Sequence, residues 1–393
     1  MGGATVFTTR RQSASEFFAG SAKIRDVRFG LGGHVAVVAP YGLDASASDG
    51  VAHAGNRTSS PPPGVASFQL GHRWRFTPVS DSRLHVVFGA GQVGRALVAH
   101  LSGEGKAVRV VSRHRPQTLP DGVTSRPVDV TDGDAAVEAA EGASVVYQCL
   151  NAPYTEWPRR FPPLQRAVMA AAERSDALLV TLENVYGYGP TGGTPMTETT
   201  PMAATTVKGL ARVAMTQELL AASEAGRLRI AIGRASDFFG AGVTESTLGE
   251  RVFANAVADK HAAFIGNPDL LHTYSYVPDM AAGLAILGTD ERAVGQIWHL
   301  PGPETSTTRA VLDLIAGQLG HSVPVRDVPK FVMRTAGLVS PMMRGLAEMS
   351  YQFEQPFILD TTKFESTFGA AVTPMDVAIK ETVAWYRGQR SAS

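Results

Sequence analysis

From residue 84 onward the chain alternates apolar runs with stretches of helical periodicity. Leu84–Phe88 is mostly apolar, residues 93–101 carry apolar side chains at helical spacing, and Val108–Val111 is a second apolar run. Short apolar runs predict buried strands, and the spaced stretch predicts a helix packed against them. Because this alternation continues to about residue 233, we expect an α/β fold with a doubly wound parallel sheet, Rossmann-like.

The same patterns divide the chain into three parts. Further strands are expected within 123–132 and at 143–150, 177–182 and 228–233, with helices at 135–140, 161–175 and 206–225. Residues 83–240 are thus expected to form a nucleotide-binding domain. The shorter elements of 241–393 predict a smaller, mainly substrate-binding lobe, interleaved with the last elements of the sheet. Residues 1–82 are rich in Ser, Ala, Gly and Pro, which predicts a disordered or loosely ordered extension.

A glycine turn joins the first expected strand to the first helix. The residues are Gly89-Ala90-Gly91-Gln92-Val93-Gly94. In a βαβ unit the first glycine allows the tight turn, the second lets the backbone approach a pyrophosphate, and the third permits close helix–strand packing. The first helical turn, including Gln92 and Val93, would then offer unpaired N–H groups to the phosphates. We expect this turn to bind a dinucleotide.

The residues at the end of the second expected strand indicate whether the dinucleotide is NAD or NADP. A carboxylate at this position would bind both ribose hydroxyls and favour NAD, but the chain has Ser112 followed by Arg113. The planar cation of Arg113 suits a 2′-phosphate. We therefore expect NADP, with Ser112 and Arg113 in the cofactor site. The alternatives are NAD and a solvated basic turn.

Composition restricts the partners. The chain has 36 basic and 36 acidic residues, so nothing in its net charge indicates a nucleic acid or an anionic membrane. The single cysteine, Cys149, lies in an apolar run and is expected to be a buried structural thiol, as in a reduced cytoplasmic protein. No apolar stretch approaches the length of a membrane span, and the ten histidines show no metal-ligand spacing. We expect a small-molecule substrate and no metal.

Residues 84–387 resemble the extended short-chain dehydrogenase/reductase family, also called the NAD-dependent epimerase/dehydratase family. The resemblance rests on the glycine turn and on six further pieces in the expected order: Asp129-Val130, Asn151-Ala152, Asn184–Gly187, Arg234–Gly240, Tyr276–Ala281 and Trp298–Gly302. It implies that Asp129 and Val130 lie beside the adenine. It also implies that Asn151 and Ala152 contact the cofactor and that Lys208 binds the nicotinamide ribose.

One departure from the family pattern concerns the proton. The family carries Tyr-x-x-x-Lys on the helix after the fifth strand, with a supporting Ser or Thr at the end of that strand. Here the lysine is Lys208, but the position four residues earlier is Ala204, and the supporting position falls at Leu182. The proton must come from elsewhere. Tyr186 and Lys208 are the nearest catalytic candidates, with Glu183 a further possibility.

These observations favour an NAD(P)H-dependent oxidoreductase acting on a ketone or secondary alcohol. Residues 331–351 are rich in Met, Leu and Val and hold few cations besides Arg334 and Arg344, which favours a mainly apolar small metabolite. Two alternatives stay open: an epimerase or dehydratase acting on a sugar or sugar nucleotide, and a non-catalytic nucleotide-binding or redox-sensing module. The oligomeric state, including a homodimer, also stays open.

Overall fold

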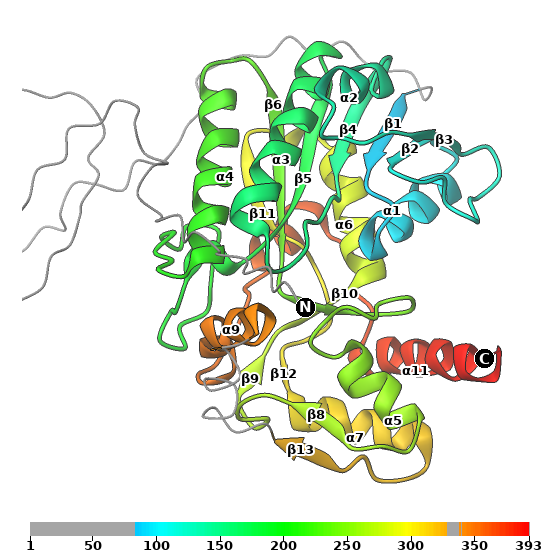
Figure 1. Ribbon diagram of the computed structural model, residues 1–393, viewed down its shortest axis with the longest axis vertical. Helices are drawn as coiled ribbons and strands as arrows, with labels where there is room; N and C mark the ends of the chain where they lie inside the picture. The colour runs from blue at the N-terminus through cyan, green and yellow to red at the C-terminus, as the bar shows by residue number, and fades with distance from the viewer. Residues whose placement is uncertain (1–82, 328–337, 339, 393) are drawn as a thin grey trace, which may run out of the picture. The chain divides into compact units, whose positions relative to one another are not determined.

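The centre of the fold is a seven-stranded parallel sheet (Figure 1). The computed structural model describes residues 83–327, 338 and 340–392, all within one compact unit that spans Phe68–Ser393. The extension expected at 1–82 lies outside the described residues. The strand order is β11-β6-β5-β4-β1-β2-β3. The strands are β1 Leu84–Phe88, β2 Ala107–Ser112, β3 Thr124–Pro127, β4 Ala143–Gln148, β5 Leu178–Asn184, β6 Arg229–Ala235 and β11 Gln296–His299.

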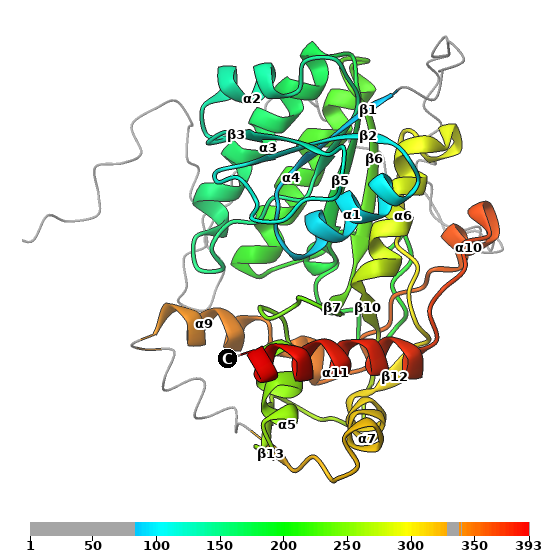
Figure 2. The same ribbon diagram turned by 90° about the vertical axis from the view of Figure 1, so that its right-hand side faces the viewer.

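Helices cover both faces of this sheet (Figure 2). On one face lie α1 (Gln92–Gly103) and α6 (Val277–Thr289); on the other lie α2 (Gly133–Ala139), α3 (Trp157–Arg174) and α4 (Val207–Glu224). Apolar side chains of the strands point alternately into the two resulting cores. The predicted α/β fold is confirmed, with most boundaries within two residues. The exception is α3, which begins at Trp157 rather than at residue 161, ahead of the internal Pro162 and Pro163.

The sheet reverses its strand order between β1 and β4. Val86 of β1 pairs with Arg109 of β2 on one side and with Val146 of β4 on the other, all in parallel register. The chain therefore leaves β1 and β4 towards opposite faces, and a crevice opens at their carboxyl ends. Open parallel sheets bind their ligands at such a point.

The lobe after β6 is built from short elements around a separate apolar core that includes Phe253, Ile315 and Ile379. Its strands are β7 Asp237–Phe239, β8 Ala262–Phe264, β9 Leu271–His272, β10 Tyr274–Tyr276, β12 Ser306–Thr307 and β13 Val325–Asp327. Its helices are α5 Asn255–Val257, α7 Thr308–Leu319, α9 Pro341–Glu348 and α11 Met375–Ala392, with the helical turns η2 Gly249–Ala254 and η4 Ser350–Phe353. Of the remaining elements, η1 Tyr186–Tyr188 follows β5, and η3 Glu291–Ala293 and α10 Thr362–Phe368 pack beside β11. Among the described residues, no helix is both long enough and apolar enough to cross a membrane.

Candidate cofactor and active site

Backbone contacts leave no room for a side chain at two positions of the glycine turn, Gly89 and Gly94. Gly89 has φ +110°, and a methyl group built there would lie 2.6 Å from the carbonyl oxygen of Cys149. A methyl group at Gly94 would lie 1.9 Å from the carbonyl oxygen of Gly89. Cys149 follows β4 and is partly buried, and burial raises the pKa of its thiol to about 12.

Gly91 differs from the other two glycines because a methyl group built there would meet nothing within 4 Å. Gly91 is also the N-cap of α1, with no side-chain cap, and the first turn of the helix carries no acidic residue. The N–H groups at this helix end are therefore available to an anion that approaches Gly91. The residues present fit the pyrophosphate of a dinucleotide.

The side chains expected at the adenosine end gather near one another. Arg113 is exposed, and its charge contributes to lowering the pKa of Asp129. The larger cause of that shift is Thr131, whose N–H and hydroxyl donate to Asp129 Oδ1 over 3.0 and 2.8 Å. Ser112 instead donates its hydroxyl to the carbonyl oxygen of His114, at 2.7 Å, so it shapes the turn after β2.

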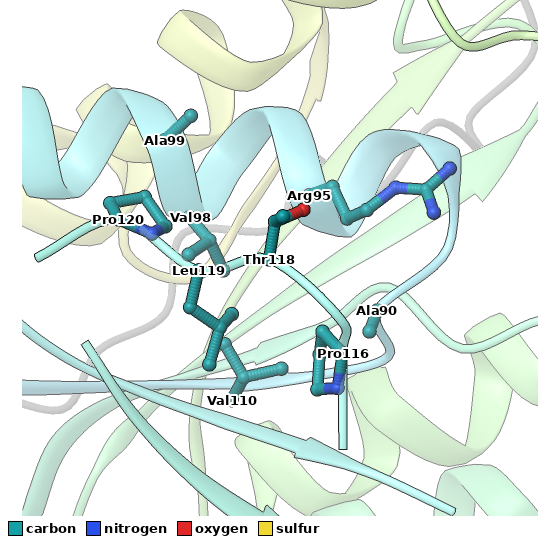
Figure 3. A pocket seen from close by; sticks show the side chains of 9 residues that line it. All are labelled: Ala90, Arg95, Val98, Ala99, Val110, Pro116, Thr118, Leu119 and Pro120. Atoms are coloured by element: carbon teal, nitrogen blue, oxygen red, sulfur yellow. The ribbon is translucent and has the colours of Figure 1, made fainter. Parts of the chain in front are cut away.

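A pocket of about 360 Å³ lies between α1 and the loop after β2 (Figure 3). Val98, Val110 and Leu119 form its apolar wall, and Ala90 of the glycine turn lies at one end. Figure 3 shows the guanidinium of Arg95 extending away from that apolar wall. The pocket borders the glycine turn and not the sheet edge that carries Lys208.

Beyond β4 the chain enters an aromatic cluster, formed by Tyr154, Trp157, Phe161 and Tyr186. Ala152 is buried against it, and the Trp157 indole N–H donates to the Ala152 carbonyl oxygen at 3.1 Å. Trp157 stacks between Phe161 and Tyr186, with ring centroids 5.5 and 5.7 Å away.

The remaining residues expected after β3 and β4 lie at the carboxyl ends of the strands. Val130 is buried, whereas Asn151 is exposed. Asn151 and Ala152 directly precede the aromatic cluster, which therefore forms the wall of the crevice beside β4.

Lys208 occupies the second position of α4. The helix begins at Val207 because the hydroxyl of Thr206 accepts the N–H of Gly209 at 3.1 Å and caps the first turn. The Lys208 side chain is only 7% exposed, and its ammonium lies 3.3 Å from Glu348 Oε2. The same ammonium lies 4.2 Å from the centre of the Tyr154 ring. The structure therefore places Lys208 beside a phenol, but not one from its own helix.

Tyr186 lies in the same region with a different environment. Its N–H donates to Asn184 Oδ1 at 3.3 Å, and its ring is held by Trp157. Burial raises the pKa of the Tyr186 phenol well above its usual value, and the negative charge of Asp237 adds to the shift. The phenol is therefore protonated at neutral pH.

Glu183, weighed above as an acid, is part of a buried ion pair. Its Oε2 lies 3.1 Å from Arg234 Nε, and both side chains are at most 3% exposed. The hydroxyl of Thr216 lies 2.9 Å from each Glu183 oxygen. A carboxylate that is fully engaged in this way stabilises the junction of β5 and β6 and is not placed to give up a proton to a ligand.

Asp237 begins β7, two residues after β6 ends, and its charge affects several tyrosines of this region. Its Oδ2 is 3.0 Å from His272 Nε2, and its charge raises the pKa values of Tyr154, Tyr186 and Tyr351, in each case after burial as the main cause. The buried hydroxyls of Ser236 and Tyr351 have no hydrogen-bond partner among the described residues. Polar groups of this kind are available to a ligand.

Sequence reasoning did not identify two residues of this site, Tyr154 and Glu348. Tyr154 follows the expected Asn151-Ala152 piece by two residues, which was the available signal. Glu348 lies in the 331–351 stretch, of which the structure describes 338 and 340–351; Arg334 therefore lies outside the described residues. The residues of α9 that face Lys208 are Gly345 and Glu348. This part of the stretch therefore presents no apolar wall to the lysine.

Comparison with known proteins identifies the family of this chain. Residues 85–300 match the NAD dependent epimerase/dehydratase family, which is more than half of the chain. The chain belongs to that family. One relative of this epimerase/dehydratase chain, dTDP-6-deoxy-L-talose 4-dehydrogenase (NAD(P)(+)) of Kitasatospora kifunensis, is 25% identical over 266 residues, which cover 64% of this chain and 83% of the relative.

Two solved structures with NAD share the fold. UDP-glucose 4-epimerase of Thermus thermophilus is 18% identical, with a TM-score of 0.62, over 78% of this chain and 99% of that chain. dTDP-glucose 4,6-dehydratase of Bacillus anthracis is 16% identical, with a TM-score of 0.66, over 79% and 98%. The predicted family and Rossmann-like fold are thus confirmed, and relatives of this chain use NAD or NAD(P).

Proposed function

We propose that the protein is an NAD(P)-dependent oxidoreductase that acts on a secondary alcohol or ketone of a sugar or sugar nucleotide. The observation that carries the proposal is Lys208, buried at the carboxyl edge of the sheet beside the phenol of Tyr154. The nicotinamide, when bound, supplies or removes the hydride. The chain holds the pyrophosphate at Gly91, the ribose at Lys208 and the substrate above Asp237.

A sugar suits this crevice better than the mainly apolar metabolite favoured by the sequence alone. The hydroxyls of Ser236 and Tyr351 are buried without partners, and a ligand rich in hydroxyl groups satisfies them. An apolar ligand would leave both unpaired, which costs about 1–3 kcal/mol for each group. The similarity to a deoxysugar-nucleotide dehydrogenase supports the same substrate class.

The test is a spectrophotometric screen with NAD⁺ and NADP⁺ in parallel. dTDP-6-deoxy-L-talose and other nucleotide-linked deoxysugars form one arm, and apolar secondary alcohols of similar size form the other. We expect reduction of the cofactor only with the sugar arm. Turnover of the apolar alcohols alone would contradict a sugar substrate and favour the mainly apolar metabolite instead.

Ala204 supports a second candidate, a nucleotide-binding module without turnover. The position of the family tyrosine holds a methyl group, and Lys208 is paired with Glu348. Cofactor binding without turnover of any substrate in either arm of the screen would favour this candidate.

Arg113 is expected to give a preference for NADPH over NADH. A charge-assisted bond to the 2′-phosphate contributes roughly 1.5–3 kcal/mol, so Arg113→Ala should weaken NADPH binding by roughly 10–150-fold and leave NADH binding unchanged. Fluorescence titration with both cofactors measures the effect. Arg115→Ala, which removes an exposed arginine from the same loop, is the control. Equal loss of both cofactors in Arg113→Ala would refute the assignment.

A further inference from the structure

Position 204 cannot supply a phenol in this fold. Thr206 caps α4, which begins at Val207. Ala204 therefore lies outside the helix, three residues before its first residue. It is also enclosed: a methyl group built at Gly189 would lie 2.9 Å from Ala204 Cα, and one built at Gly209 would lie 2.5 Å from Ala204 Cβ. A tyrosine ring at 204 would require this turn to open. Any phenol that serves Lys208 must therefore come from another element.

Tyr154 brings such a phenol from the loop after β4. The Lys208 ammonium lies over its ring, 4.2 Å from the ring centre. Its ring packs edge-on against Trp157, with centroids 5.8 Å apart, and this contact fixes the ring plane. The hydroxyl donates to the carbonyl oxygen of Gly345 in α9, at 3.2 Å. Tyr154 is thus a protonated, oriented donor whose proton is directed at a carbonyl oxygen.

We propose that Tyr154, assisted by Lys208, exchanges the proton with the substrate in place of the tyrosine that is absent at position 204. The proposal rests on the oxidoreductase function proposed above. In the reducing direction the substrate carbonyl carbon gains a hydride, and its oxygen gains the phenolic proton of Tyr154. The C=O group becomes CH–OH, and the phenolate that remains is balanced by the Lys208 ammonium. In the oxidising direction the phenolate takes the hydroxyl proton back.

Two residues of α9, Gly345 and Glu348, contact the proposed donor pair of Tyr154 and Lys208. The Gly345 carbonyl is the same type of acceptor as a ketone, so the Tyr154 hydroxyl that donates to it can donate to a substrate oxygen in the same way. Glu348 is a positioning residue: its Oε1 accepts the Lys208 backbone N–H at 3.2 Å while its Oε2 pairs with the ammonium. It holds Lys208 beside the Tyr154 ring.

The nearby charges keep Tyr154 protonated before the substrate arrives. Burial raises the pKa of the Tyr154 phenol, and the carboxylates of Asp237 and Glu348 raise it further, whereas Arg251 lowers it. A general acid must hold its proton at neutral pH until the acceptor is in reach.

Two matched variants test the assignment, Tyr154→Phe and Tyr186→Phe. Each removes one hydroxyl from the same aromatic cluster and keeps the ring. With the substrate found in the screen, Tyr154→Phe should lose about 10²–10⁴-fold in turnover, the usual effect of a lost general acid, whereas Tyr186→Phe should lose less than about tenfold. NADPH affinity, measured by fluorescence, should be unchanged in both. If Tyr186→Phe loses more turnover than Tyr154→Phe, the proposal is wrong and Tyr186 is the proton donor.

A second readout needs no turnover. The protein is labelled with fluorotyrosine, and the Tyr154 signal is assigned by its loss in Tyr154→Phe. We expect this fluorine resonance to shift when NADP⁺ is added and again in Lys208→Met, while the signal of Tyr276, bonded to Glu381 in the lobe, stays fixed. An unmoved Tyr154 signal with NADP⁺ bound would overturn the proposal. A wild-type protein that binds NADP⁺ but turns over no substrate would instead refute the proposed function, and the catalytic role of Tyr154 with it.

Discussion

Gly94→Ala is expected to destabilise the nucleotide-binding unit by about 3 kcal/mol or more, at the upper end of what overpacking costs. The new methyl group would lie 1.9 Å from the carbonyl oxygen of Gly89, which is backbone and cannot swing aside. Helix α1 would have to move away from β1, and the turn that faces the pyrophosphate would move with it. Denaturant unfolding and NADPH titration should both show the loss.

Gly91→Ala is the matched control, because it places the same methyl group within the same turn, three residues before Gly94. Nothing lies within 4 Å of that position, and its φ of −76° suits alanine. Unfolding free energy should change by less than about 0.5 kcal/mol. NADPH binding should nevertheless weaken about tenfold or more, since the methyl group occupies the approach of the pyrophosphate. If Gly91→Ala binds NADPH normally, the phosphate does not lie at this turn.

The second large effect is expected from the buried pair of Glu183 and Arg234. Arg234→Leu leaves the Glu183 carboxylate buried with only the Thr216 hydroxyl as partner, and such breaks cost about 3–5 kcal/mol. Thermal or denaturant unfolding measures the loss. Arg229→Gln provides the control, because Arg229 lies on the same strand and donates to the Asp176 carbonyl oxygen at the surface. That variant should change stability by less than about 0.5 kcal/mol.

The double variant Glu183→Leu with Arg234→Leu separates charge from packing. The double variant no longer holds an unpaired carboxylate, so part of the stability should return, while the buried Arg212 loses the opposing charge of Glu183. A double variant as unstable as Arg234→Leu alone would show that the shape of the two side chains, and not their charges, holds β5 and β6 together.

The nucleotide-binding half was readable from the sequence because its signals are local. A buried strand, a capped helix and a glycine turn each depend on residues within about ten positions of one another, and β1, α1 and β2 begin and end close to the predicted residues. The glycine spacing carries its own chemistry. Gly94 is required by its contact with Gly89 in the same turn, whereas Gly89 is required by its positive φ and by the backbone of Cys149 after β4. Arg113 was predicted from the end of the second strand, whereas Asp129 was expected only from the family resemblance; the pairing of β2 with β3 brings the two close together.

The β11 strand could not be predicted from local sequence patterns. Residues 296–299 form a short edge strand, recognisable from the sequence only as part of a family motif. The strand joins the sheet by pairing Gln296–His299 with residues 231–234 of β6. The first part of the lobe separates these two strands in the sequence. A strand of this length has no periodicity of its own, so pairing with a distant partner decides it.

The surroundings of Lys208 were beyond any local pattern. Helical periodicity and the Thr206 cap place the lysine at the start of α4, and the family motif identifies it. Its partners, however, come from 54 residues earlier at Tyr154 and 140 residues later at Glu348. Chain segments so far apart meet only when the sheet edge and the lobe are both folded. Local patterns were thus enough for the fold and for the position of the glycine turn, whereas tertiary packing alone decided which phenol and which carboxylate lie beside the lysine.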